Sequence, residues 1–144
     1  MRMKSTLKAA ILALFLTPYF ASSAGSEMIT KDSLVEMFEN ISNNTEWDLS
    51  SPLLWGYFFT DSKRETLQKS VPDLEAKGYK FVEIFLSAKE NPGESDLWWL
   101  HVEKIETHTP DSLFKRNKEL YQFAAENHLE SYDGMDVGPV GGKH

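Results

Sequence analysis

The sequence predicts an α+β domain of the ferredoxin-like kind, a split β-α-β sandwich (β-α-β-β-α-β) with an antiparallel sheet and an extra N-terminal helix. Three observations predict it. Apolar residues recur at helical spacing in three segments, aromatic and β-branched runs form four strands between them, and the length of 144 residues suits one domain. The elements follow in the order helix, strand, helix, strand, strand, helix, strand.

The first part of this order is a helix followed by a strand. Residues 29–42 (ITKDSLVEMFENIS) place apolar side chains at helical spacing behind Thr30, a residue type that favours the N-cap position. Residues 52–60 (PLLWGYFFT) are rich in aromatics and bounded by turn formers. This composition is typical of a strand.

The second helix is predicted for residues 61–77, with Asp61 and Ser62 as its cap and Gly78 as its stop. Pro72 lies inside this segment. A proline in a helix interior removes one main-chain hydrogen bond and clashes with the preceding turn. We therefore expect a bend or a break near residues 70–71.

The second half of the chain is predicted as a hairpin, a helix and a last strand. Residues 79–87 and 97–106 read as two strands joined by the turn 88–96, which contains Asn, Pro, Gly and charges. A threonine followed by proline begins the helix 109–127. Residues 131–140 form the final strand.

The N-terminus has the pattern of an export signal. Three basic residues precede an apolar run at residues 9–16, and small residues lead to a cleavage point near Ala24 and Gly25. Eight apolar residues are too few to span a bilayer, which takes roughly 20. We expect a signal peptide at 1–24, a periplasmic or secreted protein without stable membrane insertion after cleavage, a single domain at 25–140 and a disordered tail at 141–144.

Charge indicates which partners suit the chain. Its formal net charge is −7, and loss of residues 1–24 removes three of the 15 basic residues and none of the 22 acidic ones, which leaves −10. Nucleic acids and anionic membrane surfaces need positive charge on the protein, so neither is expected as a direct partner. The charge favours a basic protein partner. Without cysteine, the fold depends on its core alone.

The sequence shows no pattern of an enzyme or a metal site. His101, His108, His128 and His144 include no pair at the i, i+4 spacing of a helical zinc site, and cysteine is absent. The chain has no Gly-x-Ser-x-Gly elbow and no glycine-rich phosphate loop. We predict no catalytic residue, no cofactor and no metal ligand.

Alternation in the two hairpin strands predicts an aromatic sheet face. Its members are Tyr79, Phe81, Phe85 and Trp99, with Glu83, His101 and Glu103 among them. An apolar face rimmed by polar groups is typical of a surface that binds a partner chain or a small ligand. Alternatively, the leading helix covers this face as a second layer of core. A third alternative is acid–base chemistry by the two carboxylates and the histidine.

The stretch from about residue 53 to residue 137 resembles the family of the regulator of ribonuclease E activity B. Three segments carry the likeness, and the first is the strand that ends in Phe59, Thr60 and Asp61. The segment 61–81 (DSKRETLQKSVPDLEAKGYKF) is similar to that family's first core helix entering a strand, and 120–134 (LYQFAAENHLESYDG) to its second core helix and the start of a Tyr-Asp-Gly strand. The resemblance implies the same fold and a non-enzymatic, ribonuclease inhibitor-like role in protein binding. It adds Tyr132, Asp133 and Gly134 to the expected partner-binding residues. Members of the family are cytosolic, whereas this chain carries an export signal.

These observations lead to one hypothesis and two alternatives. The chain is expected to be an exported, non-enzymatic binding or inhibitor module that acts on a basic protein. Alternatively, it binds a small ligand or catalyses a reaction through Glu83, His101 and Glu103. If the export signal is not used, the protein is instead a cytosolic regulator of a ribonuclease.

Overall fold

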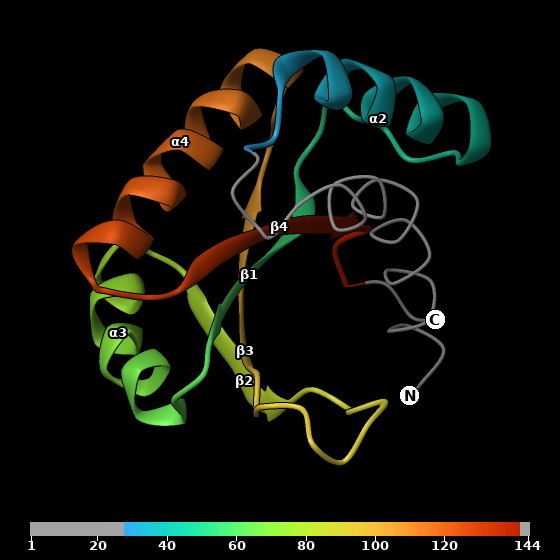
Figure 1. Ribbon diagram of the computed structural model, residues 1–144. Coiled ribbons are helices and arrows are strands. Elements are labelled where there is room, and N and C mark those ends of the chain that lie inside the picture. Colours follow the sequence, from blue (N-terminus) through green and yellow to red (C-terminus); the bar gives the residue numbers. More distant parts are fainter. Residues whose placement is uncertain (1–27, 142–144) are drawn as a thin grey trace.

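The computed structural model describes residues 28–141 and shows one four-stranded antiparallel sheet with three helices (Figure 1). The strands lie in the order β2-β3-β1-β4, which is the order of the ferredoxin-like split fold. The α+β prediction is confirmed. The elements are α2 (Lys31–Asn44), β1 (Leu53–Asp61), α3 (Arg64–Ala76), β2 (Lys80–Leu86), β3 (Trp98–Glu106), α4 (Pro110–Glu126) and β4 (Ser131–Gly138).

The expected signal peptide at residues 1–24 and residues 142–144 of the expected tail lie outside the described residues. Between residues 28 and 141, no helix has the length and apolar character that a bilayer crossing requires.

Two helices begin as their cap residues predict. Thr30 accepts a hydrogen bond from the Ser33 main-chain N–H (3.1 Å) at the start of α2. At the start of α4, Thr109 accepts from the Ser112 N–H (3.1 Å), and the Ser112 hydroxyl accepts from the Thr109 N–H (2.9 Å). These contacts satisfy main-chain donors that a helix start leaves without an intrahelical acceptor.

Helix α3 runs through Pro72 without a break, so the break expected at residues 70–71 is wrong. Pro72 is exposed, and water can therefore hydrogen-bond the carbonyl that loses its partner. The cap also differs in detail. The N-cap is Lys63, and the Asp61 carboxylate accepts from its N–H (2.9 Å) and from the Glu130 N–H (3.0 Å). Gly78 ends the helix as predicted, with a positive φ of 97°.

The core lies between the sheet and the helices. Side chains of β1 form its centre, since Trp55, Tyr57 and Phe59 are almost completely buried. Helices α3 and α4 cover them with Leu67, Leu74, Leu113 and Leu120, which are at most 2% exposed.

Helix α2 lies on the same side of the sheet as α3 and α4. It contacts the N-terminal part of α4, where Lys31 pairs with Asp111, and its Phe38 ring stacks on Trp55 at 6.0 Å between centroids (Figure 1). The alternative in which the leading helix covers the opposite face is therefore wrong. Both the α4 contact and the Trp55 contact lie on the helix side of the sheet.

Candidate partner-binding face

The sheet face opposite the helices carries a row of aromatic side chains. The rings of Phe85 and Trp99 stack in parallel at 6.2 Å, Trp99 meets Phe58 edge-on at 6.2 Å, and Phe58 stacks on His101 at 4.4 Å. These four residues come from β2, β3 and β1, and we call them the aromatic strip. The prediction that Phe85, Trp99 and His101 share this face is confirmed by the strand register.

Polar residues lie beside the aromatic strip. Glu83 is opposite His101 in the register of β2 and β3, and Glu103 is opposite Lys80. Opposite charges across strands stabilise a pair modestly. Like His101, Glu83 and Glu103 thus lie on the face on which alternation placed them.

A glycine brings two further polar groups together on this face. A Cβ atom at Gly56 would lie 2.4 Å from Asp136 Oδ1 and 2.8 Å from His101 Nε2. The absence of a side chain at Gly56 therefore lets the carboxylate from β4 and the imidazole from β3 approach across β1. Gly56, Phe58 and Asp136 were not predicted for this face, although alternation along residues 53–61 puts Gly56 and Phe58 on the same side.

Tyr79 and Phe81 lie on the helix side, so their predicted place on the aromatic face is wrong. The register of β2 shifts between Phe81 and Glu83, which places Phe81 opposite the buried Val102. One extra residue in a strand reverses the side-chain direction on one side of the bulge. Tyr79 is buried, and its ring meets Tyr57 edge-on at 5.6 Å. This burial raises the pKa of Tyr79 to about 12.

The Tyr132-Asp133-Gly134 triplet forms a second irregularity, at the start of β4. Tyr132 is buried on the helix side, whereas Gly134 lies opposite Phe58 on the other face, with φ of 116°. Between them, Asp133 accepts a hydrogen bond from Ser131, and burial raises the pKa of its carboxyl. The triplet therefore directs one aromatic ring into the core, and only its glycine reaches the face that carries the aromatic strip.

Strand β2 forms one end of the sheet and exposes apolar side chains. Among the described strands it pairs only with β3. Four of its side chains are 36–43% exposed: Phe81, Val82, Phe85 and Leu86. We call these residues the β2 edge. A strand at the end of a sheet offers free main-chain donors and acceptors, and added apolar side chains give a partner strand something to pack on.

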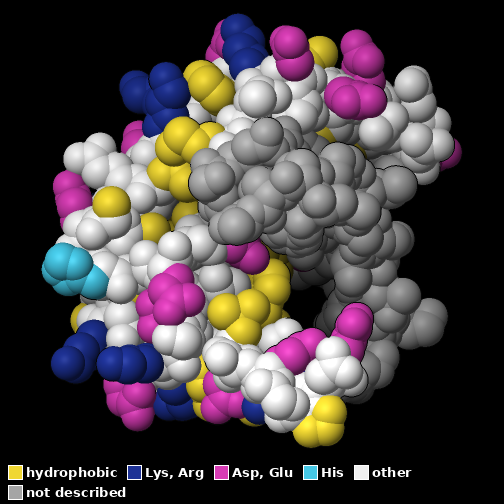
Figure 2. Space-filling model, viewed as in Figure 1, with side chains coloured by type: hydrophobic (Ala, Val, Ile, Leu, Met, Phe, Trp, Pro, Cys, Tyr) yellow, Lys and Arg dark blue, Asp and Glu magenta, His cyan; other side chains and the backbone are white. Residues whose placement is uncertain are grey.

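Acidic residues follow the β2 edge along the chain. Residues 80–96 contain four acidic side chains and two basic ones, and Lys89 pairs with Asp96 at 2.7 Å. Figure 2 shows acidic side chains spread over one view of the molecule, whereas most of the visible lysines and arginines lie on the side of α3 and α4. The segment 80–96 therefore carries a formal net charge of −2, from two basic and four acidic side chains.

A second polar cluster lies on the helix side, around Glu106. Its Oε2 accepts hydrogen bonds from the Tyr57 hydroxyl (2.7 Å), from His108 Nε2 (3.1 Å) and from Arg116 Nη1. Because a carboxylate accepts hydrogen bonds, His108 donates to it from Nε2, and His108 Nδ1 lies 2.8 Å from the Ser112 hydroxyl. The cluster ties β1, β3 and α4 together.

The electrostatics of Glu106 follow from these contacts. Burial opposes ionisation of its carboxyl, but the hydrogen bonds from His108, Arg116 and Tyr57 and the charge of Arg116 outweigh it and lower the pKa to about 2. Burial also raises the pKa of Tyr57. The hydrogen bonds and charges of this cluster fix the positions of its side chains, which is typical of a structural network.

The described residues hold no cluster of three or more His, Asp or Glu side chains suited to a metal ion.

Comparison with known proteins gives one family. A family model described as regulator of ribonuclease activity B matches residues 31–137. The chain belongs to this family. The match confirms the resemblance found in the sequence and extends it to α2, which is therefore part of the family's domain. No curated protein matches the chain at a significant level.

Proposed function

We propose that the chain is a non-enzymatic regulator that works by binding a protein partner through the β2 edge, and that a ribonuclease is the first candidate partner. The family match carries the proposal, because its description is that of a regulator of ribonuclease activity. The exposed apolar side chains of the β2 edge supply a surface on which a partner can pack.

Charge supports a basic partner. The surface of a ribonuclease that binds RNA must attract phosphates and is therefore basic. Four acidic residues lie in or directly after β2: Glu83, Glu90, Glu94 and Asp96. Their charge is complementary to such a surface and would speed the association of the two proteins. A regulator bound to the RNA-binding surface of a ribonuclease competes with RNA. It therefore lowers ribonuclease activity without catalysing a reaction itself.

The signal-like pattern of residues 1–24 supports a compartment outside the cytoplasm. We propose that residues 1–24 are removed and that the partner lies outside the cytoplasm. The intact mass of the native protein from separate periplasmic and cytosolic fractions tests this. A species beginning near Gly25 outside the cytoplasm is expected. A full-length species confined to the cytosol would instead support the cytosolic alternative.

The approach of His101 and Asp136 over Gly56 supports a second candidate function, a small-ligand or catalytic site with Glu83 and Glu103 nearby. A carboxylate beside an imidazole suits acid–base work. The variants His101→Ala and Glu103→Gln test it, because a ligand-dependent rise in melting temperature should then fall. An unchanged rise in both variants would contradict a ligand site at this place.

A matched pair of variants tests the proposed regulator. Phe85→Ser removes an apolar ring from the β2 edge, and Val35→Ser removes a similarly exposed apolar side chain from α2 (36% and 37% exposed). We measure inhibition of RNA cleavage in a periplasmic extract by the chain beginning at Gly25. We expect the Phe85→Ser variant to need roughly tenfold more protein for the same inhibition, as for a central interface residue.

Val35→Ser should inhibit as well as the unchanged chain does. Equal inhibition by the two variants would contradict binding at the β2 edge. If the unchanged chain does not inhibit the extract but inhibits a cytosolic one, the partner lies in the cytosol.

A further inference from the structure

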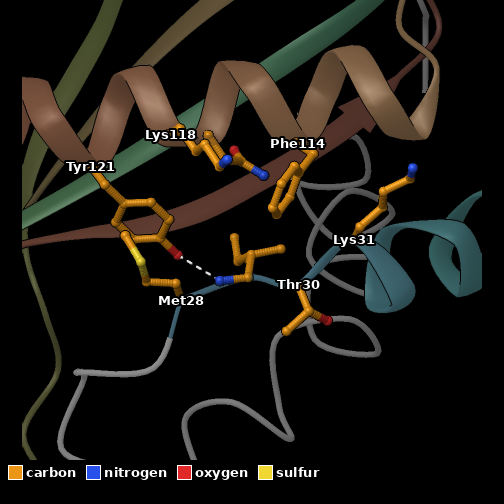
Figure 3. Close-up of a pocket in the computed structure, with 8 residues that line it drawn as sticks. Met28, Thr30, Lys31, Phe114, Lys118 and Tyr121 are labelled. Carbon is orange, nitrogen blue, oxygen red and sulfur yellow. Dashed lines mark hydrogen bonds between the residues drawn. The ribbon is translucent and has the colours of Figure 1, made fainter.

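The segment before α2 and helix α4 line an apolar pocket of about 240 Å³ (Figure 3). Met28 and Ile29 line one side, and Phe114 and Tyr121 line the other. The Ile29 main-chain N–H donates to the Tyr121 hydroxyl (2.9 Å), drawn as a dashed line in Figure 3, and this bond holds the segment on α4.

Asn117 is a buried polar residue in the wall of this pocket. Its side chain is on a residue only 1% exposed, and its Oδ1 accepts a hydrogen bond from the Tyr132 hydroxyl (2.6 Å). No described residue accepts a hydrogen bond from its Nδ2. If the Asn117 amide were turned over, its oxygen instead of its nitrogen would lack a hydrogen-bond partner, because the Tyr132 hydroxyl bonds with one of these two atoms. A buried amide donor without an acceptor is unfavourable, so a ligand that supplies the acceptor gains a hydrogen bond.

The charges at the pocket favour a neutral ligand. The Lys31 ammonium pairs with Asp111 at 2.5 Å, and the Lys118 ammonium lies 4.6 Å from the centroid of the Phe114 ring. Both lysines therefore already have electrostatic partners. An apolar cavity of about 150 Å³ binds benzene, so a pocket of about 240 Å³ has room for a small ring compound.

We propose that this pocket binds a small, neutral, mainly apolar molecule that carries one carbonyl oxygen, and that this oxygen accepts a hydrogen bond from Asn117 Nδ2. The apolar walls contribute binding through burial of the ligand, and Asn117 fixes its orientation. The site lies on α4 and is separate from the β2 edge, so it stands whether or not the proposed regulation is correct.

Two probes of equal shape test the proposal by NMR titration of the full chain. Cyclohexanone carries the carbonyl acceptor, and methylenecyclohexane replaces its oxygen with a methylene group. We expect cyclohexanone to cause saturable shifts of the Asn117 side-chain NH₂ signals and the Ile29 amide signal. Water hydrogen-bonds the cyclohexanone carbonyl before binding, so the affinities of the two probes also differ by this desolvation. The informative quantity is therefore the ratio of their affinities, compared between the unchanged chain and a variant without Asn117. Shifts that do not saturate would overturn the proposal.

A double variant identifies the donor. Asn117→Leu with Tyr132→Phe removes both partners of the buried hydrogen bond, a change that a core of the same shape tolerates. The ratio of the cyclohexanone affinity to the methylenecyclohexane affinity should fall roughly fivefold, as expected for the loss of one neutral hydrogen bond, while methylenecyclohexane still binds. An unchanged ratio would contradict the role of Asn117. If the double variant does not fold, Phe114→Trp serves instead: it narrows the pocket and should weaken both probes, and unchanged binding of both would place them elsewhere.

Discussion

Replacing Glu106 by glutamine should destabilise the fold in a pH-dependent way. In the folded chain, hydrogen bonds from His108, Arg116 and Tyr57 and the Arg116 charge lower the pKa of Glu106 to about 2, against burial, which acts in the other direction. The ordinary value is 4.5. A carboxyl whose pKa is lowered by folding stabilises the protein above its unfolded pKa, and this contribution is lost as the pH falls through the folded pKa.

The size of this contribution follows from the two pKa values. At about 1.4 kcal/mol per pKa unit, the difference between 4.5 and about 2 corresponds to roughly 3 kcal/mol at neutral pH. The Glu106 side chain is 17% exposed, so water screens it only weakly. Glutamine has the shape of the protonated acid. The difference between Glu106→Gln and the unchanged chain should therefore be about 3 kcal/mol at pH 7 and should diminish between pH 4.5 and pH 2.

Urea unfolding at pH 7, 4.5 and 2.5 measures this difference, and the other carboxyl groups cancel because both chains contain them. Glu119→Gln is the matched control. Its side chain is 57% exposed and makes one contact with Arg116 (3.2 Å), so we expect a loss below about 0.5 kcal/mol. A Glu106→Gln difference that is equal at pH 7 and pH 2.5, or below about 1 kcal/mol at pH 7, would contradict this stabilising role of the Glu106 carboxylate.

Three further substitutions have expected costs that urea unfolding can measure. Gly56→Ala should lose roughly 1–3 kcal/mol, because its Cβ would lie 2.4 Å from the Asp136 carboxylate, whereas Gly93→Ala, with no atom within 4 Å, should be nearly neutral; equal effects would contradict the close approach. Thr109→Ala should cost about 1 kcal/mol through loss of the α4 cap, and an unchanged stability would contradict that cap. Gly78→Ala, at φ of 97°, should cost about 1 kcal/mol or more, and a gain in stability would contradict the positive φ.

Local patterns in the sequence predicted the elements and their order well. Thr30 and Thr109 are caps that act within one turn, and the alternation in residues 98–106 depends only on the pleat of one strand. Such features do not need the rest of the fold. They therefore lie where the sequence places them.

The orientation of β2 could not be predicted in the same way. A single extra residue between Phe81 and Glu83 separates the aromatic strip from Tyr79 and Phe81, which belong to the helix side. A bulge is determined by pairing with β3 and by the space under the helices. Alternation within one strand carries no information about it.

Contacts between residues far apart in the sequence could not be predicted either. The Glu106 cluster joins residues from Tyr57 to Arg116, and the pocket on α4 joins Ile29 to Asn117. Neither has a recognisable spacing along the chain, because the tertiary fold alone brings these groups together.

Photocrosslinking at single positions in living cells tests whether the β2 edge binds a protein partner. A photoreactive phenylalanine derivative replaces Phe85 at the β2 edge in one variant and Val35 on α2 in the other. The proposal predicts one crosslinked protein at Phe85, absent at Val35, that mass spectrometry identifies as a ribonuclease or another basic protein. Crosslinks that are equal at both positions, or that occur only at Val35, would contradict a partner-binding β2 edge.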